Sequence, residues 1–251
     1  MRNLQPLPPR GPGRPPKTSP AAVSSVSGSV GVLDLFAVAP QNARDRLLAA
    51  THELLVERVR GPVSLTEICS RAGLNTALVK YYFGSKDGLF AALHAHLRAQ
   101  YRADIDRIDR SDRTPTEKLE IYVENGVRMF ARYPYIAYIL RQEHGDDEVA
   151  RFVREYLSPL LSWHSRLIAE GRKRGEFRDV DPRFLMFSII GACQFLFVVP
   201  SWVEAAFGKS DLSEADIDAF VEHTTEMVLR SVGASSTRRR RSRTPKRRAP
   251  R

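Results

Sequence analysis

Apolar residues recur at the three- and four-residue spacing of amphipathic helices along most of the chain after residue 40. The first stripe runs from residue 47 to residue 59, where Gly61-Pro62 ends the helix. Pro159 lies inside a later helix and is expected to kink or divide it. No stretch shows the alternation of a β-strand, so the pattern predicts an all-α protein. The later helices are expected over about 85–108, 115–132, 135–144, 147–171 and 213–232.

Residues 184–203 form a run of 20 uncharged residues, which is the length of a membrane-spanning helix. Polar residues and Pro200 interrupt the run, and no second run of this kind accompanies it. We therefore prefer a helix over about 182–206, opened by Asp181-Pro182, to a membrane span. Such a helix is expected to be buried on all sides, for example in a subunit interface.

The net charge of +10 is concentrated at the two ends of the chain. Residues 235–251 carry nine basic residues and no acid, and residues 1–42 carry four basic residues and one acid. Residues 43–234 are left with a net charge of −2. Basic ends on a near-neutral body are typical of a protein that binds a polyanion, although a solvated tail without function has the same composition.

The sequence shows no catalytic or metal-binding constellation. Cys69 and Cys193 lie in apolar stretches without ligand spacing, and they are expected to be buried free thiols. His94 and His96 are two residues apart and point to different sides of a helix. A Gly-rich phosphate loop and a nucleophile elbow are also missing. We therefore expect no enzyme, no metal site and no cofactor.

Residues 64–86 carry the signals of two short helices joined by a tight turn. Ser64 and Glu67 have the spacing of a capping box, which begins a helix. Gly73 stands where that helix ends, and Asn75 is a good N-cap for the next one. This arrangement is a helix-turn-helix, although a small three-helix packing unit carries the same signals. Its predicted core is Ile68, Cys69, Ala72, Leu74, Val79 and Phe83.

In a helix-turn-helix the second helix enters the major groove of DNA. Four residues of this helix would face base edges: Thr76, Ala77, Leu78 and Lys80. The apolar Ala77 and Leu78 can touch thymine methyl groups, and Thr76 can hydrogen-bond a base or a phosphate. Tyr82 and Lys86 are expected to hold phosphates, since Lys86 lies in the first turn of the following helix.

The whole segment resembles the N-terminal domain of the TetR family of transcription regulators. There, Thr/Ser-x-x-x-Ile-Ala-x-x-Ala-Gly-Val-Ser is followed by Tyr-x-His/Tyr-Phe and then by Ser-Lys-x-x-Leu. Three departures are Cys69 in place of Ala, Ala77 where many members carry Gly, and Lys80 where many carry Tyr. The operator sequence therefore does not transfer. The matching residues are Ser64, Ile68, Ala72, Gly73, Leu74, Asn75, Tyr82, Phe83, Ser85, Lys86 and Leu89.

The resemblance implies a role for each part of the chain. The region after residue 110 would bind an effector and dimerise, chiefly through the last two helices, at about 182–206 and 213–232. Aromatic residues in this region form either plain core or the wall of a pocket. A pocket would favour a hydrophobic effector, with Tyr138, Trp163 or Gln194 as polar contacts. The positions implied to contact DNA are Leu65, Thr66, Thr76, Ala77, Leu78, Lys80, Tyr82 and Lys86.

The two basic tails add candidate DNA contacts. Gly13-Arg14-Pro15 resembles the core of an AT-hook, in which an arginine such as Arg14 enters the minor groove of A·T-rich DNA. A disordered leader without such a contact is the alternative. The arginine-rich run at 238–251 carries no base-reading structure and is expected to attract phosphates of any sequence.

The predicted organisation is a three-helix helix-turn-helix domain over 41–90, followed by a larger helical ligand-binding and dimerisation domain over 91–233. A disordered Pro-rich arm over 1–40 and an Arg-rich tail over 234–251 flank them. We expect a homodimeric repressor of the bacterial cytoplasm, on the nucleoid, that binds a palindromic operator in double-stranded DNA, responds to a small effector and does not bind a membrane. The alternative is a non-specific architectural DNA-binding protein driven by its tails.

Overall fold

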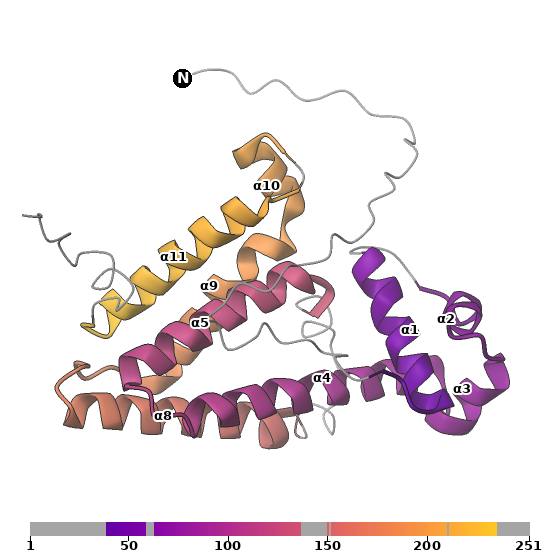
Figure 1. Cartoon of the computed structure of the whole chain (residues 1–251), viewed down its shortest axis with the longest axis horizontal. Helices are drawn as coiled ribbons and strands as arrows, with labels where there is room; N and C mark the ends of the chain where they lie inside the picture. The colour runs from indigo at the N-terminus through magenta and orange to yellow at the C-terminus, as the bar shows by residue number, and fades with distance from the viewer. Residues whose placement is uncertain (1–38, 59–62, 137–149, 151, 210, 235–251) are drawn as a thin grey trace, which may run out of the picture.

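The computed structural model describes residues 39–58, 63–136, 150, 152–209 and 211–234. Every regular element in these ranges is helical, which confirms the predicted all-α fold. A small N-terminal group of helices and a larger C-terminal body are joined by one long helix, α4 (Lys86–Asp109) (Figure 1). Both basic tails and Arg14 lie outside the described ranges.

The N-terminal group consists of α1 (Ala43–Glu57), α2 (Leu65–Ala72) and α3 (Thr76–Phe83). The side chain of Asn42 caps α1 by accepting a hydrogen bond from the Asp45 amide at 2.9 Å. All three helices contact one another, and α1 and α3 also contact α4. Their shared core is fully buried and consists of Leu47, Ile68, Val79, Leu89 and Leu93. The first part of α4 thus belongs to the packing of this group.

The body is arranged around α5 (Pro115–Arg132), which contacts α4, α8 (Ser158–Lys173), α9 (Pro182–Val198) and α11 (Glu214–Ser231). Figure 1 shows α5 between the layer of α4 and α8 and the layer of α11. The helix begins at a capping box formed by Thr114 and Glu117 and has Pro115 in its first turn. The predicted helices at 85–108, 115–132 and 213–232 correspond to α4, α5 and α11 to within a residue or two.

Pro159 lies where the helical run changes type, and the run is not divided there. A π-helical turn, η1 (Val153–Leu157), runs directly into α8, and Pro159 lies in the first turn of α8. Proline has no amide N–H, so it cannot donate to the carbonyl of Glu155 four residues earlier. That carbonyl instead accepts a hydrogen bond from the guanidinium of Arg102 on α4, at 3.2 Å. The proline therefore frees a backbone group that ties η1 to α4.

The expectation of one continuous helix over 182–206 is wrong, whereas its burial in a subunit interface stays a prediction, since the structure holds a single chain. Pro200 disfavours the helical conformation of Val199, so α9 ends at Val198 and α10 (Pro200–Phe207) begins at an angle of 76°. No single helix in the described ranges is long and apolar enough to cross a membrane, and only this bent pair passes that test together. Several large side chains of α9 and α10 are exposed in the single chain: Phe184, Phe187, Phe195, Trp202 and Phe207.

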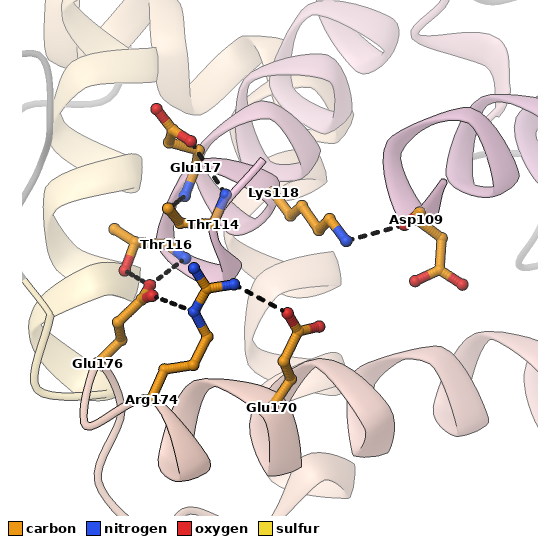
Figure 2. A network of polar contacts seen from close by, with 8 residues as sticks. All are labelled: Asp109, Thr114, Thr116, Glu117, Lys118, Glu170, Arg174 and Glu176. Carbon is orange, nitrogen blue, oxygen red and sulfur yellow. Dashed lines mark hydrogen bonds and ion pairs between the residues drawn. The ribbon is translucent and has the colours of Figure 1, made fainter. Parts of the chain in front are cut away.

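A polar network fixes the junction of α4, α5 and α8 (Figure 2). The carboxylate of Glu176 accepts hydrogen bonds from the amide and the hydroxyl of Thr116, at 3.0 and 2.8 Å. It also pairs with Arg174, at 3.1 Å. The ammonium of Lys118 donates to the carbonyl of Asp109, the last residue of α4, at 2.8 Å. The start of α5 is thereby held to the ends of α4 and α8.

The packing at the end of α8 gives a first testable prediction. A Cβ added at Gly171 would lie 2.2 Å from Cδ2 of the buried Phe177. We expect Gly171→Ala to lower the free energy of unfolding by about 1–3 kcal/mol because the core is overpacked, although helix propensity alone favours alanine by about 1 kcal/mol. Urea unfolding measures whether the substitution lowers or raises the free energy of unfolding. Ser165→Ala, at an exposed site on α8, is the control with little effect, and a stabilised Gly171→Ala protein would contradict the packing argument.

Candidate DNA-binding site

The first helix of the helix-turn-helix, α2, begins at the predicted capping box. The Ser64 hydroxyl accepts from the Glu67 amide at 3.2 Å, and the Glu67 carboxylate accepts from the Ser64 amide at 2.9 Å. Arg58, just beyond α1, pairs with the same carboxylate at 2.6 Å. The bond from the Ser64 amide and the Arg58 guanidinium lower the pKa of Glu67 to about 2. The start of α2 is therefore held by an ionised group at neutral pH.

The turn between α2 and α3 depends on Gly73. Its φ of 65° is in the left-handed region that favours glycine. The next amide, that of Leu74, donates back to the carbonyl of Cys69 at 2.9 Å. Arg46 of α1 lies under the turn and donates to the carbonyl of Ala72 at 2.5 Å. The angle between α2 and α3 is thus set by a glycine and by a side chain from the supporting helix.

Helix α3 turns one face to the core and the other away from it. Asn75 caps it by accepting from the Leu78 amide at 3.3 Å, and Gly84 ends it. Of the predicted core residues, Ile68, Cys69, Ala72 and Val79 are buried, while Leu74 and Phe83 are half-buried against the same core. Three of the four residues predicted to face the groove, Thr76, Ala77 and Lys80, are exposed, and Leu78 is half-buried.

The remaining predicted contact residues flank α3. Thr66 on α2 is exposed, whereas Leu65 before it is half-buried against the core. Tyr82 is 38% exposed near the end of α3. Lys86 opens α4, and its ammonium lies 5.7 Å from the centre of the Phe90 ring. These side chains are available to a ligand, but their contacts with DNA stay a prediction.

One exposed residue of α3 was missed by the sequence reasoning. Tyr81 is 79% exposed, and its ring lies 4.9 Å from that of Tyr82 in an edge-on arrangement. It occupies the unspecified position of the family's Tyr-x-His/Tyr-Phe motif, so the motif does not predict a DNA contact there. Its place four residues after Ala77 puts it on the same face of the helix, and this spacing was the available signal.

The helix-turn-helix also contacts the body apart from α4. His52 of α1 lies with Nδ1 2.5 Å from the hydroxyl of Tyr135, and its ring lies 4.9 Å from that of Tyr133. All three side chains are buried. Tyr133 and Tyr135 follow directly after α5, so this contact joins the supporting helix of the DNA-binding group to the end of the central body helix.

Two of the three candidate effector residues lie on different helices of the body. Trp163 is buried on α8, and Gln194 is half-buried on α9. Tyr138 lies outside the described residues. Cys69 and Cys193 are buried free thiols, and over the described ranges no group of His, Cys, Asp or Glu side chains is placed to hold a metal ion.

Comparison with known protein families identifies the family of this chain. The family model described as "Bacterial regulatory proteins, tetR family" matches residues 47–93. The model described as "Tetracyclin repressor-like, C-terminal domain" matches residues 112–237, which is half of the chain. The chain belongs to the TetR family. TetR-family proteins are DNA-binding transcription regulators and not enzymes, and this protein is therefore a TetR-type transcription regulator.

Individual relatives of this TetR-family regulator are distant. The HTH-type transcriptional regulator BetI of Brucella canis is 29% identical over 129 residues, which span 50% of this chain and 64% of BetI. A TetR/AcrR-family regulator from Thermobifida fusca superposes with a TM-score of 0.59 at 22% identity, over 74% of this chain and 96% of its own. FadR of Bacillus subtilis, solved in complex with stearoyl-CoA, gives 0.56 at 19% identity, over 74% and 98%. The two structures show a common fold.

The turn glycine gives the second prediction. A Cβ at Gly73 would lie 2.9 Å from the Arg46 guanidinium, whereas a Cβ at Gly208, the left-handed glycine that ends α10 with a φ of 69°, would meet nothing within 4 Å. Both alanine variants carry the cost of a left-handed residue, about 1–2 kcal/mol. We expect Gly73→Ala to be the less stable of the two in thermal unfolding, because Arg46 must also move. Equal losses would show that Arg46 does not support the turn.

Proposed function

We propose that this regulator is a homodimeric repressor that binds a palindromic operator and is released by a small hydrophobic effector. The observation that carries the proposal is the exposed face of α3, which is capped at its start, closed by a glycine and packed on a buried core. Two such helices in a dimer would reach half-sites about one turn of DNA apart. The proposed site of action is the nucleoid in the bacterial cytoplasm.

The proposed DNA surface combines base contacts and phosphate contacts. Lys80 would donate to a guanine and Thr76 to a base or a phosphate, while Ala77 and Leu78 would pack on thymine methyl groups. We add Tyr81 to this set because of its exposure. Phosphates would be held by Tyr82 and Lys86, Leu65 and Thr66 at the start of α2 would add further DNA contacts, and Arg14 would reach the minor groove.

The proposed dimer interface is the exposed apolar surface of α9 and α10. Phe184, Phe187 and Phe195 lie on one face of α9, and Phe195 contacts Trp202 across the bend with ring centres 5.8 Å apart. Met227 of α11 is also 46% exposed. Exposed apolar surface of this kind supports a site of association, and the family resemblance implies dimerisation through the last helices.

Two features support control by an effector. FadR of Bacillus subtilis shares this fold and binds stearoyl-CoA, a ligand with a long apolar chain. Within this chain, the His52–Tyr135 contact gives the body a second connection to the DNA-binding group besides α4. A ligand that changes the packing of the body would act through these two connections on the spacing of the two α3 helices.

Replacing Lys80 tests the base-reading role. We expect Lys80→Ala to weaken operator binding about tenfold or more, because a bidentate base contact contributes about 1–3 kcal/mol, and to weaken random-DNA binding much less. Titrations at one fixed salt concentration measure both affinities. Lys173→Ala, an exposed lysine at the end of α8, is the matched control. Equal losses on operator and random DNA would show that Lys80 contacts phosphates only.

Replacing Phe187 tests the dimer. We expect Phe187→Glu to weaken dimerisation at least tenfold, because the interface would bury an unpaired carboxylate. Sedimentation velocity over a range of protein concentrations measures the dimer dissociation constant. Ala169→Glu places the same charge on the exposed side of α8 and is expected to leave the dimer intact. A Phe187→Glu protein that dimerises like the wild type would exclude this face.

Genome-wide mapping of bound sites tests the proposed function as a whole. A repressor of this type is expected to occupy a few palindromic sites and to bind them at least about 1,000-fold more tightly than random DNA. Occupancy spread over the genome with no such ratio would instead favour the architectural role that the basic tails permit.

A further inference from the structure

Five ring side chains from four elements form a continuous aromatic cluster in the body. Tyr122 of α5 lies at its centre, with ring centres 4.9 Å from Trp163 and 5.1 Å from His164, both on α8. Tyr101 of α4 lies 6.4 Å from Tyr122 and 5.8 Å from Tyr156 of η1. Tyr122, Trp163 and His164 are buried, whereas Tyr101 and Tyr156 are half-buried. The cluster thus runs from the edge of the body into its core.

Two polar atoms in the buried part of this cluster lack a hydrogen-bond partner. They are Nε1 of Trp163 and Nε2 of His164, and each is fully shielded by the described part of the chain. Buried polar groups in proteins are almost always paired, with the protein, with water or with a ligand. Two such atoms on consecutive residues, whose rings are 4.9 Å apart, therefore point to a missing partner.

One of the two atoms is a hydrogen-bond acceptor and the other is a donor. Nδ1 of His164 lies 2.9 Å from the carbonyl oxygen of Leu160, and since a carbonyl only accepts, Nδ1 carries the proton. Burial lowers the pKa of His164 to about 4, so the ring is neutral and Nε2 presents a bare lone pair. The indole N–H of Trp163 can only donate. The cluster therefore holds one unused acceptor beside one unused donor.

We propose that the aromatic cluster binds the polar group of the effector, and that this group is neutral and carries both a donor and an acceptor, as a hydroxyl or a carboxamide does. The inference rests on the effector control proposed above. A hydroxyl would donate to Nε2 of His164 and accept from the indole N–H of Trp163. A carboxylate has no proton for His164, and an ammonium has no lone pair for Trp163, so each would leave one atom unpaired.

The position of the cluster connects it to the DNA-binding group. Tyr101 lies on α4, the helix whose first part packs in the helix-turn-helix core. Arg102, the next residue, holds the carbonyl of Glu155 in η1. Short π-helical turns are frequent at functional sites. A ligand that enters between α5 and α8 would therefore displace η1 and α4 together.

The test uses the full-length protein and four chain-matched probes: 1-octanol, octanamide, octanoate and octylammonium. Trp163 and Trp202 are the two tryptophans of the chain, so the indole ¹H–¹⁵N spectrum has two signals, which Trp202→Phe assigns. We expect octanol and octanamide to shift the Trp163 indole proton downfield at pH 7.5, as a new hydrogen bond requires. We expect octanoate and octylammonium to bind at least tenfold more weakly.

His164→Phe removes the acceptor and keeps an aromatic ring, and we expect it to reduce the tenfold preference for neutral probes to less than threefold. His223→Phe, on the exposed side of α11, is the control that keeps the preference. The wild-type probe series decides the proposal even if His164→Phe does not fold. Octanoate binding as tightly as octanol, or no shift of the Trp163 signal by any probe, would overturn it.

Operator binding by the same samples separates this inference from the proposed function. If the protein binds a specific operator and an anionic compound releases it, the regulator stands and the neutral-group inference fails. If the neutral probes bind at Trp163 but no specific operator exists, the ligand site stands and the repressor proposal fails.

Discussion

The body of this protein depends on the burial of α5 on almost every side. A helix in that position must pair each of its polar side chains, because an unpaired buried charge is strongly destabilising. Asn125 donates to Asp104 of α4 at 2.9 Å, and Arg128 joins Glu124, at 3.1 Å, to Asp218 of α11, at 2.7 Å. These bonds fix the rotation of α5 about its axis. That rotation in turn places Tyr122 against α8.

Local chemistry made much of the fold predictable from the sequence. A cap is an interaction between residues two or three positions apart, so Ser64, Asn75, Asp181 and Ser213 could be recognised as helix starts without knowledge of the fold, and each accepts the expected backbone hydrogen bond. The exposed face of α3 follows from helical spacing once its core residues are known. The family motif then placed this helix correctly.

The features that the sequence reasoning missed depend on residues far apart in the chain. His52 and Tyr135 are 83 positions apart, and no local pattern indicates that they meet. The unpaired atoms of Trp163 and His164 become visible only when the surroundings of both rings are known. Pro200 interrupts the apolar run in the sequence, but the run alone does not indicate that two helices meet there. Its effect is to bend the apolar segment by 76°.

The continuity of α4 limits how this molecule can be altered. Leu89 and Leu93 are buried in the DNA-binding group, Ile105 and Ile108 are buried in the body, and no loop separates the two pairs. One inserted residue would rotate one group against the other by about 100° and move it by about 1.5 Å. A chimera made from two such regulators must therefore preserve the helical phase of α4, and exchanging domains at a loop is not open to the designer.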